Sequence, residues 1–283
     1  MANVTEFLTL SNGVKIPSIG FGTWQTPEGD VATEAVKAAI EAGYRHIDTA
    51  QAYGNERGVG EGIRRSGISR DELFVTTKLT NDNHTYEITK SSFEQSLKDL
   101  GLDYVDLFLV HWPRPMKFRD CWEKANAETW KAMEELYEEG KIRAIGVSNF
   151  MPKHLSALLE TAKIAPMVNQ IRLCPGCTQD EIVNYSRDMG MILEAYSPLG
   201  TGKIFDSEEV KSLAAKYGKS IAQISIRWSL QMGFLPLPKS VNADRIRANL
   251  DVFDFELSDE DMSFLTGLTG VAGGAPDPDN MPF

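Results

Sequence analysis

The stretch DVATEAVKAAIEAGYRHIDTA, at residues 30–50, contains the pattern that decides the fold of this chain. Its first part carries apolar residues such as Val31 and Ala35 at helical spacing, and Gly43 is a typical helix stop. A β-rich run at 46–50 follows directly. A helix that leads into a strand in this way is part of a parallel βαβ unit, so the stretch predicts an α/β fold.

The same alternation recurs along the rest of the chain. The predicted strands cover residues 19–24, 46–50, 73–79, 104–112, 144–149, 167–173, 191–197 and 234–240. The predicted helices cover residues 30–43, 87–100, 126–139, 152–161, 179–189, 207–232 and 243–250, with the segment 207–232 broken in two at Gly218. The glycines Gly58, Gly60 and Gly62 do not have the spacing of a dinucleotide-binding loop and indicate close helix packing instead.

Eight strands with eight helical connections predict a (β/α)8 barrel that forms a single domain over residues 1–283. The ends of successive predicted strands lie 21 to 43 residues apart, which suits one βαβ repeat of about 30 residues in each interval. No linker or low-complexity tract interrupts the pattern. A doubly wound open sheet is the structural alternative, because five or six of these units would build one equally well.

Three segments lie outside the eightfold repeat. Asn12-Gly13 stands between two alternating runs at 9–16, which predicts a β-hairpin that could plug one end of a barrel. After the last repeat, Ser258 and the acidic residues behind it predict an additional helix with a good N-cap. The stretch 270–283 is rich in Gly, Pro and Asp and predicts a loop or flexible tail.

Composition and charge limit the classes of function. The 283 residues include 29 Lys and Arg against 40 Asp and Glu, and the net charge of −11 argues against general nucleic-acid binding. No run approaches the roughly 20 apolar residues of a membrane span, and the first residues do not have the pattern of a signal peptide. The 3 cysteines are too few and odd in number for a disulfide framework. We therefore expect a cytoplasmic protein that binds neither nucleic acid nor membrane.

Polar side chains gather at the ends of the predicted strands. They are Asp48, Lys78, His111, Asn149, Gln170, Tyr196 and Lys239. Each alone has an ordinary structural explanation, such as a turn cap for an aspartate or a solvated surface group for a lysine. Together they favour a functional site, because catalytic residues of barrels lie at the carboxyl ends of strands and independent surface residues have no reason to share that end.

The chemistry of such a set follows from its side chains. Asp48 would keep Lys78 charged in a partly dry pocket, and this ammonium would lower the pKa of a nearby phenol, Tyr53, from about 10 toward neutrality. Tyr53 could then donate a proton. A neutral His111 could orient a carbonyl oxygen, so that both groups stabilise the oxyanion formed when hydride reaches the carbon. The pattern predicts a reductase site that uses no metal.

Other motifs compete with this interpretation. The histidines show no HxxxH or Cys/His pairing at ligand spacing, so we expect no metal site. Cys174 and Cys177 form a CxxC motif, but no second CxxC accompanies it and it does not open a helix, so we expect incidental pairing rather than a working dithiol. In the segment 238–245, Lys239 and Arg245 surround a helix start, a local reversal of charge that favours phosphate binding.

Longer motifs accompany these residues. They are GYRHIDTA at 43–50, YGNE at 53–56, TTKL at 76–79, LFLVHWP at 107–113, GVSNF at 146–150, YSPLG at 196–200, and KSV at 239–241 followed by Arg245 and Asn249. With them the chain resembles the aldo-keto reductase family over nearly its whole length. Its short loops are similar to those of the branch that includes 2,5-diketo-D-gluconate reductase and prostaglandin F synthase-like proteins.

The resemblance implies a (β/α)8 barrel that uses NADPH to reduce aldehydes or ketones. It implies that Tyr53 is the general acid, that Asp48 and Lys78 tune it, and that His111 orients the carbonyl group. The residues implied at the nicotinamide and its carboxamide are Ser148, Asn149, Gln170 and Tyr196. Those implied at the adenosine 2′-phosphate and the adenine, which favour NADP over NAD, are Lys239, Ser240, Arg245 and Asn249. The remaining implied cofactor contacts are Thr23, Ser197, Leu199 and Val241.

The same resemblance indicates a class of substrate and an oligomeric state. Trp24, Trp112 and Phe118 would wall an aromatic pocket suited to small aldehydes, α-dicarbonyls, keto sugars or ketones with apolar bodies, although Phe118 is equally well explained as a loop anchor. The resemblance suggests a monomer. Some proteins of this fold family are regulatory subunits that bind the cofactor with negligible turnover, and this alternative stands beside the reductase.

The sequence departs from the pattern of the family in two places. Arg172 and Cys174 stand where relatives usually carry an acidic residue and a histidine, so the outer end of the sixth predicted strand differs. Ala248 stands where many relatives have a glutamate just before the adenine asparagine. Neither departure touches the four catalytic positions.

Overall fold

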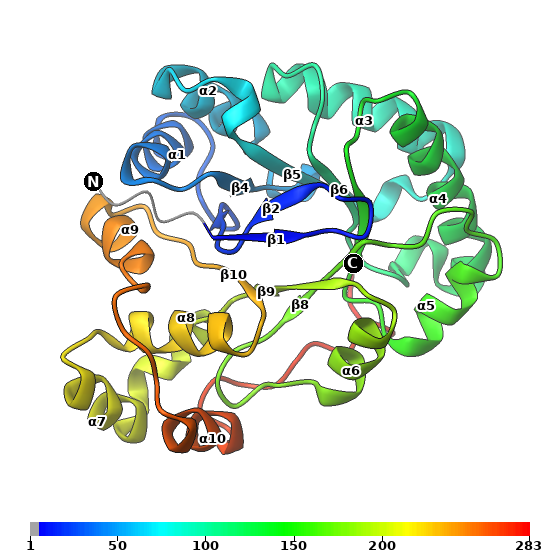
Figure 1. The fold of residues 1–283 in the computed structure, drawn as a ribbon. Helices are drawn as coiled ribbons and strands as arrows, with labels where there is room; N and C mark the ends of the chain where they lie inside the picture. The colour runs from blue at the N-terminus through cyan, green and yellow to red at the C-terminus, as the bar shows by residue number, and fades with distance from the viewer. Residues whose placement is uncertain (1–5) are drawn as a thin grey trace.

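The computed structural model describes residues 6–283, which contain a barrel of eight parallel strands (Figure 1). The strands are β3 (Phe21–Gly22), β4 (His46–Asp48), β5 (Phe74–Leu79), β6 (Leu107–Val110), β7 (Ile145–Ser148), β8 (Val168–Arg172), β9 (Ile192–Tyr196) and β10 (Leu235–Leu237). They pair in chain order from β3 to β10. The barrel closes where the N–H groups of Gly20 and Gly22 donate to the oxygens of Pro236 and Pro238, both at 3.0 Å. The predicted (β/α)8 barrel is therefore confirmed over the open sheet.

Helices surround the barrel, as Figure 1 shows. They are α1 (Asp30–Ala42), α2 (Glu56–Ser66), α3 (Tyr86–Leu100), α4 (Trp122–Glu138), α5 (Pro152–Leu159), α6 (Asp180–Asp188), α7 (Glu208–Tyr217), α8 (Ile221–Gln231), α9 (Ala243–Leu250) and α10 (Asp259–Gly267). The predicted break at Gly218 separates α7 from α8, and Ser258 caps the additional helix α10. No helix within residues 6–283 is long and apolar enough to cross a membrane.

The glycines of α2 permit the close helix packing that their spacing predicts. A Cβ atom on Gly60 would lie 2.2 Å from the backbone oxygen of Leu100 at the end of α3. A Cβ atom on Gly62 would lie 2.7 Å from the backbone oxygen of Thr33 in α1. Because neither oxygen can move without its helix, both positions require glycine, and the role in helix packing is confirmed.

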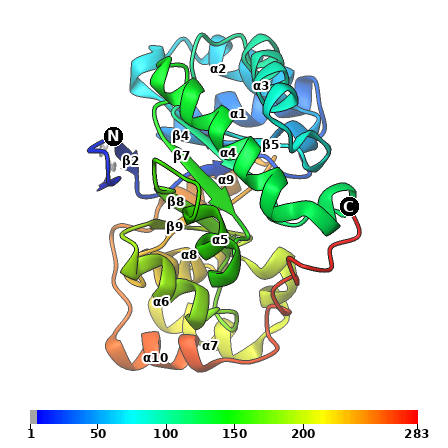
Figure 2. The same ribbon diagram turned by 90° about the vertical axis from the view of Figure 1, so that its right-hand side faces the viewer.

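The predicted hairpin covers the amino-terminal end of the barrel. Its strands β1 (Phe7–Thr9) and β2 (Lys15–Pro17) are antiparallel, and Leu10 and Ile16 are buried in the core. The side-chain amide of Asn12 donates to the backbone oxygen of Arg143, just before β7, at 2.9 Å. Figure 2 shows the hairpin on one side of the barrel and the C-terminal stretch on the other. The carboxyl ends of the strands are therefore free to form a site.

The stretch 270–283 crosses the carboxyl end of the barrel as a loop, as predicted. The backbone oxygen of Phe283 accepts a hydrogen bond from Met116 N at 3.0 Å in the 3-10 helix η4 (Met116–Cys121). Nearer its start, the backbone oxygen of Ala272 accepts from Arg172 Nη2 at 2.7 Å. These contacts hold the tail against the loops that follow β6 and β8.

Candidate active site

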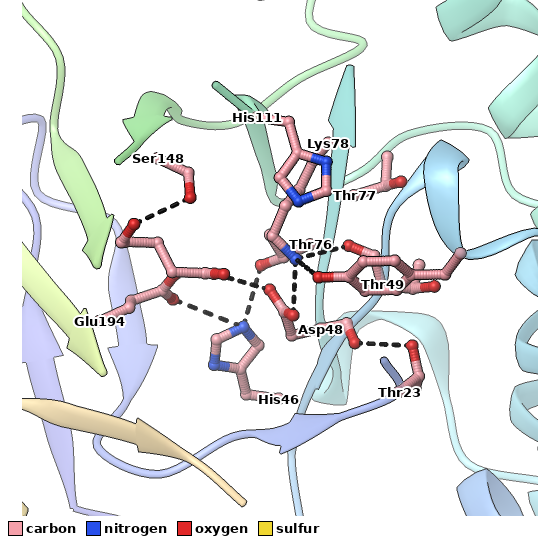
Figure 3. A network of polar contacts seen from close by, with 12 residues as sticks. Thr23, His46, Asp48, Thr49, Thr76, Thr77, Lys78, His111, Ser148 and Glu194 are labelled. Carbon is pink, nitrogen blue, oxygen red and sulfur yellow. Dashed lines mark hydrogen bonds and ion pairs between the residues drawn. The ribbon is translucent and has the colours of Figure 1, made fainter. Parts of the chain in front are cut away.

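The polar residues predicted at the strand ends meet inside the carboxyl end of the barrel. Side chains two positions apart on a strand share one face, so His46 and Asp48 both point inward from β4. Lys78 points inward from β5, and Glu194 and Tyr196 lie two positions apart on β9. Figure 3 shows His46, Asp48, Lys78 and Glu194 directed toward one another. The alternation of the strands thus builds a buried polar group in an otherwise apolar barrel.

Lys78 is the centre of this group, and its side chain has no exposed surface. Its Nζ donates to Asp48 Oδ1 at 2.7 Å, to the backbone oxygen of Thr49 at 2.8 Å and to Tyr53 Oη at 3.2 Å (Figure 3). Tyr53 reaches the ammonium from the 3-10 helix η1 (Gln51–Tyr53), one turn after β4. The three protons of the ammonium therefore all have partners, which fixes the phenol oxygen beside a positive charge.

Burial and neighbouring charges act in opposite senses on the pKa values of this group. Burial alone would lower the pKa of Lys78, but Asp48 and Tyr53 outweigh it and raise that pKa above its ordinary value. Burial raises the pKa of Tyr53, and although Lys78 acts in the lowering direction, the pKa stays above its ordinary value. The prediction of a net fall toward neutrality is therefore wrong, because the loss of hydration exceeds the attraction of the ammonium. Tyr53 is a fully protonated phenol at neutral pH.

His111 follows β6 and lies across the phenol ring. The two ring centroids are 5.7 Å apart and the rings meet edge to face. Burial, followed by the charge of Lys78, holds the pKa of His111 well below its usual range, so the imidazole is neutral. Its Nδ1 is buried without a hydrogen-bond partner. A neutral imidazole and a protonated phenol can both donate to one oxygen atom placed between them.

A second hydrogen-bonded chain runs beside the first. Ser148 Oγ at the end of β7 donates to the backbone oxygen of Gln170 at 2.8 Å and accepts from Asn149 Nδ2 at 3.0 Å. Asn149 Oδ1 accepts from Tyr196 Oη at 2.8 Å, and Asn149 Nδ2 also donates to the backbone oxygen of His111 at 3.1 Å. Asn149 has a left-handed backbone with φ +62. The structure thus brings together all the residues predicted at the nicotinamide.

Gln170 links the two chains and reveals residues that sequence reasoning missed. Its Nε2 donates to Asp48 Oδ2 at 2.8 Å and to Glu194 Oε2 at 2.7 Å, so both amide hydrogens are used. Glu194 is fully buried, and its Oε1 lies 3.7 Å from His46 Nε2. Burial, followed by the charge of Asp48, raises the pKa of Glu194. The sequence could have indicated this position of Glu194. The outer face of a strand covered by helices must be apolar, so a glutamate in such a strand has to point into the barrel.

The predicted phosphate site lies at the start of α9. Lys239 Nζ donates to the backbone oxygen of Gln25 at 3.3 Å, and Arg245 Nε donates to Ser240 Oγ at 3.4 Å. Burial, followed by the charge of Arg245, lowers the pKa of Lys239. Neither cation has a carboxylate partner within residues 6–283. At the start of α9, the Asn242 side chain accepts hydrogen bonds from the N–H groups of Asp244 and Arg245 at 3.1 and 3.0 Å.

The sequence of residues 18–269 matches the model of the aldo/keto reductase family. This chain belongs to the aldo/keto reductase family. It is 48% identical over 281 residues to a glyoxal reductase of Bacillus subtilis, covering 99% of both chains. It is 47% identical over 276 residues to a 9,11-endoperoxide prostaglandin H2 reductase of Trypanosoma cruzi, covering 96% of this chain and 95% of the relative.

A solved structure of the same family contains a dinucleotide. The crystal structure of a Bombyx mori aldo-keto reductase in complex with NADP superposes with a TM-score of 0.84 and 38% identity. The match covers 93% of this chain and 92% of the other. Both the barrel and the family resemblance expected from the motifs are therefore confirmed.

In this aldo/keto reductase, the remaining predicted cofactor residues line the same end of the barrel. Both the N–H and the hydroxyl of Thr23 donate to the backbone oxygen of Asp48 at 3.0 Å. Ser197 has a left-handed backbone with φ +50, directly after β9, and Leu199 follows as a half-buried side chain. Val241 is largely exposed, whereas Asn249 of α9 is buried. Apart from Val241, each of these positions is constrained by the fold.

The aromatic residues predicted to line the substrate pocket differ in their exposure and in their contacts. Trp24 is 47% exposed, whereas Trp112 is only 8% exposed and meets the Phe283 ring edge to face at 5.4 Å. Phe118 stacks on His84, with ring centroids 5.8 Å apart and a 19° angle between the rings. This stack fits the alternative interpretation of Phe118 as a loop anchor. The C-terminal residue Phe283 thus packs against Trp112.

The two departures from the family pattern lie at different depths in the fold. Arg172 reaches the tail through its hydrogen bond to Ala272, and Cys174 is buried beside it. Ala248 lies exposed on α9, next to the buried Asn249. Arg172 therefore helps to hold the tail, whereas Ala248 lies on the surface of the helix.

Proposed function

We propose that this enzyme of the aldo/keto reductase family reduces small aldehydes and ketones with NADPH. The observation that carries the proposal is the contact of Lys78 with both Asp48 and Tyr53, at 2.7 and 3.2 Å. It places the phenol group of Tyr53, which carries the proton, beside a buried positive charge. Such a pair suits protonation of an oxygen that gains negative charge during a reaction.

The described residues fit a nicotinamide dinucleotide phosphate. Both amide hydrogens of Gln170 are engaged by Asp48 and Glu194, which leaves Oε1 as the group free to accept from a carboxamide N–H. At the other end, Lys239 and Arg245 offer positive charge, and no carboxylate among residues 6–283 forms an ion pair with either. A 2′-phosphate would supply the negative charge that neutralises them, which is why we favour NADPH over NADH.

When it is bound, NADPH supplies the hydride for the carbonyl carbon. Tyr53 donates its proton to the carbonyl oxygen, and Lys78 stabilises the phenolate that this transfer leaves behind. The raised pKa of Tyr53 keeps the phenol protonated until the oxygen becomes basic enough to take the proton. Asp48 keeps Lys78 in place through its own hydrogen bond to Gln170.

His111 and the aromatic wall orient the substrate in this proposal. The neutral imidazole donates a hydrogen bond to the carbonyl oxygen, so that this oxygen has donors from both His111 and Tyr53. Trp112 and Phe283 offer an apolar surface near this point. A confined aromatic surface beside two donors suits short aldehydes and α-dicarbonyls, and the similarity to a glyoxal reductase supports the same class.

A substrate panel tests the proposal. The purified chain is mixed with NADPH and, in separate reactions, with glyoxal, methylglyoxal, a keto sugar and a short apolar aldehyde. NADPH absorbance and the alcohol product are measured together. We expect turnover with equal amounts of NADPH consumed and alcohol formed, and faster turnover with NADPH than with NADH. Tight NADPH binding with no turnover on any substrate would instead favour the regulatory subunit.

A further inference from the structure

The CxxC motif forms a tight turn directly after β8. Cys177 N donates to the backbone oxygen of Cys174 at 2.8 Å, and Cys174 N donates to the backbone oxygen of Cys177 at 3.2 Å. The two cysteines therefore face each other as an antiparallel pair. Pro175 and Gly176, whose φ is +79, occupy the central positions, which is the arrangement of a type II turn. The turn chemistry thus holds the cysteines opposite one another.

This arrangement suits a covalent bond between the two sulfur atoms. Residues that exchange both backbone hydrogen bonds have Cα atoms about 5.5 Å apart, and disulfides form at Cα separations of about 4.4 to 6.8 Å. Cys177 Sγ donates to the backbone oxygen of Arg172 at 3.9 Å, and the two thiols are close enough for each to shift the pKa of the other. They pack in one small cluster with Ala272 of the C-terminal tail. The backbone pairing of the two cysteines is therefore compatible with a disulfide.

The environments of the two thiols divide the roles between them. Cys174 has no exposed surface, whereas Cys177 is 8% exposed. The neighbouring Cys174 thiol, helped by the charge of Arg172 against the effect of burial, lowers the pKa of Cys177 to about 7. The same contact and burial raise the pKa of Cys174. Cys177 is therefore the nucleophile, because thiolates and not thiols attack oxidants.

We propose that Cys174 and Cys177 are a redox-active dithiol that hydrogen peroxide oxidises to an intramolecular disulfide. The Cys177 thiolate attacks one peroxide oxygen, the O–O bond breaks, and a sulfenic acid and one water form once a proton is taken up. The Cys174 sulfur then attacks the Cys177 sulfur, the S–O bond breaks, and a second water leaves with the thiol proton. An external dithiol returns both residues to thiols through a mixed disulfide.

The two cysteines lie next to the C-terminal tail. The turn lies under the C-terminal tail, because a Cβ atom on Gly176 would lie 2.8 Å from Val271 Cγ2. Arg172, two residues before Cys174, holds the tail at Ala272. The pair takes no part in the proposed hydride and proton transfers, so the oxidation goes beyond the proposed function and is tested without measuring carbonyl reduction.

The experiment uses the whole chain and the third cysteine as an internal reference. Fully reduced protein is treated with a stoichiometric amount of hydrogen peroxide, free thiols are alkylated, and peptides are identified by mass spectrometry. We expect Cys174 and Cys177 to lose alkylation together and to appear in one peptide lighter by two hydrogen atoms, with full recovery after dithiothreitol. Cys121, which is exposed and outside the turn, should stay alkylated. Oxidation of Cys121 ahead of the pair would overturn the proposal.

Two variants test the order of the steps. In Cys174→Ser, oxidation should stop at a sulfenic acid on Cys177, which dimedone captures. In Cys177→Ser, dimedone should capture almost nothing at Cys174, and Cys121→Ser should form the disulfide as the wild type does. Equal labelling of the two single variants would contradict the assignment of the nucleophile. The wild-type peptide map decides the main proposal even if one variant fails to fold, which thermal unfolding of the reduced proteins would reveal.

Discussion

Replacing Lys78 by methionine tests whether the ammonium holds the buried polar group together. The change keeps the length of the side chain and removes the positive charge. It deletes the hydrogen bonds to Asp48, Thr49 and Tyr53 at once. Asp48, only 3% exposed, keeps its hydrogen bond from Gln170 but loses the opposite charge. The variant thus leaves a carboxylate buried in the barrel without a counter-ion.

The cost of this change can be worked from the burial of the pair. Removing one partner of a buried ion pair typically destabilises a protein by about 3 to 5 kcal/mol, because the remaining charge stays desolvated. A domain is stable by only about 5 to 15 kcal/mol, so Lys78→Met should still fold but with a much lower urea midpoint. Removing the orphaned charge as well, in Lys78→Met with Asp48→Asn, should restore about 1 kcal/mol or more.

Urea unfolding followed by circular dichroism measures both variants, and NADPH-dependent turnover is measured alongside. We expect the double variant to be more stable than Lys78→Met, with turnover in both lowered by about 100-fold or more, the range ascribed to general acid catalysis. If Lys78→Met loses less than about 1 kcal/mol, or if the double variant is the less stable of the two, the ion pair does not organise the group.

Three further predictions concern other parts of the chain. Gly60→Ala should destabilise the protein by about 1 to 3 kcal/mol, because the new Cβ would lie 2.2 Å from a backbone oxygen. The control Gly267→Ala, which has open space around it, should change the melting temperature little, and equal effects of the two variants would contradict the role of Gly60 in packing. Arg245→Ala should raise the Kd for NADPH about 10-fold or more and leave the Kd for NADH nearly unchanged, measured by titration of cofactor fluorescence. An equal rise in both Kd values would show that Arg245 does not bind the 2′-phosphate. Burial raises the pKa of Glu194 to about 8, whereas the pKa of a glutamate in an unfolded chain is about 4.3. The proton on Glu194 therefore contributes fully to the stability of the fold below about pH 4.3, and this contribution is lost as the pH rises through 8. The stability of wild type relative to Glu194→Gln should therefore fall as urea unfolding is repeated from pH 5 to pH 9, and a constant difference would contradict the assignment.

The strands and their carboxyl ends could be predicted because short apolar runs recur between amphipathic helices at regular intervals. Each observed strand lies inside its predicted range, for example β3 within 19–24 and β10 within 234–240. The observed strands are shorter, because the chain leaves the ladder as soon as it turns into a loop. Helix α4 starts four residues before its predicted position at Asn126, since nothing in the preceding residues breaks a helix.

The contacts inside the barrel were harder to predict, because they depend on which strands face each other across its interior. Asp48 and Gln170 are 122 positions apart in the chain but hydrogen-bonded in the fold. The sign of the pKa change at Tyr53 depended on burial, which residue types alone do not give. The monomeric state, the cytoplasmic location and the single-domain organisation stay predictions.

The proposed reduction depends on Tyr53, which donates the proton when NADPH is the hydride donor. Tyr53→Phe removes only the hydroxyl, and Tyr185→Phe, which removes a hydroxyl hydrogen-bonded to Ser156 on the outside of the barrel, is the matched control. NADPH oxidation with methylglyoxal is followed for wild type and both variants, with cofactor binding checked by fluorescence. We expect Tyr53→Phe to bind NADPH normally and to lose turnover by about 100-fold or more, while the control keeps wild-type rates. Near wild-type turnover in Tyr53→Phe would show that Tyr53 is not the proton donor.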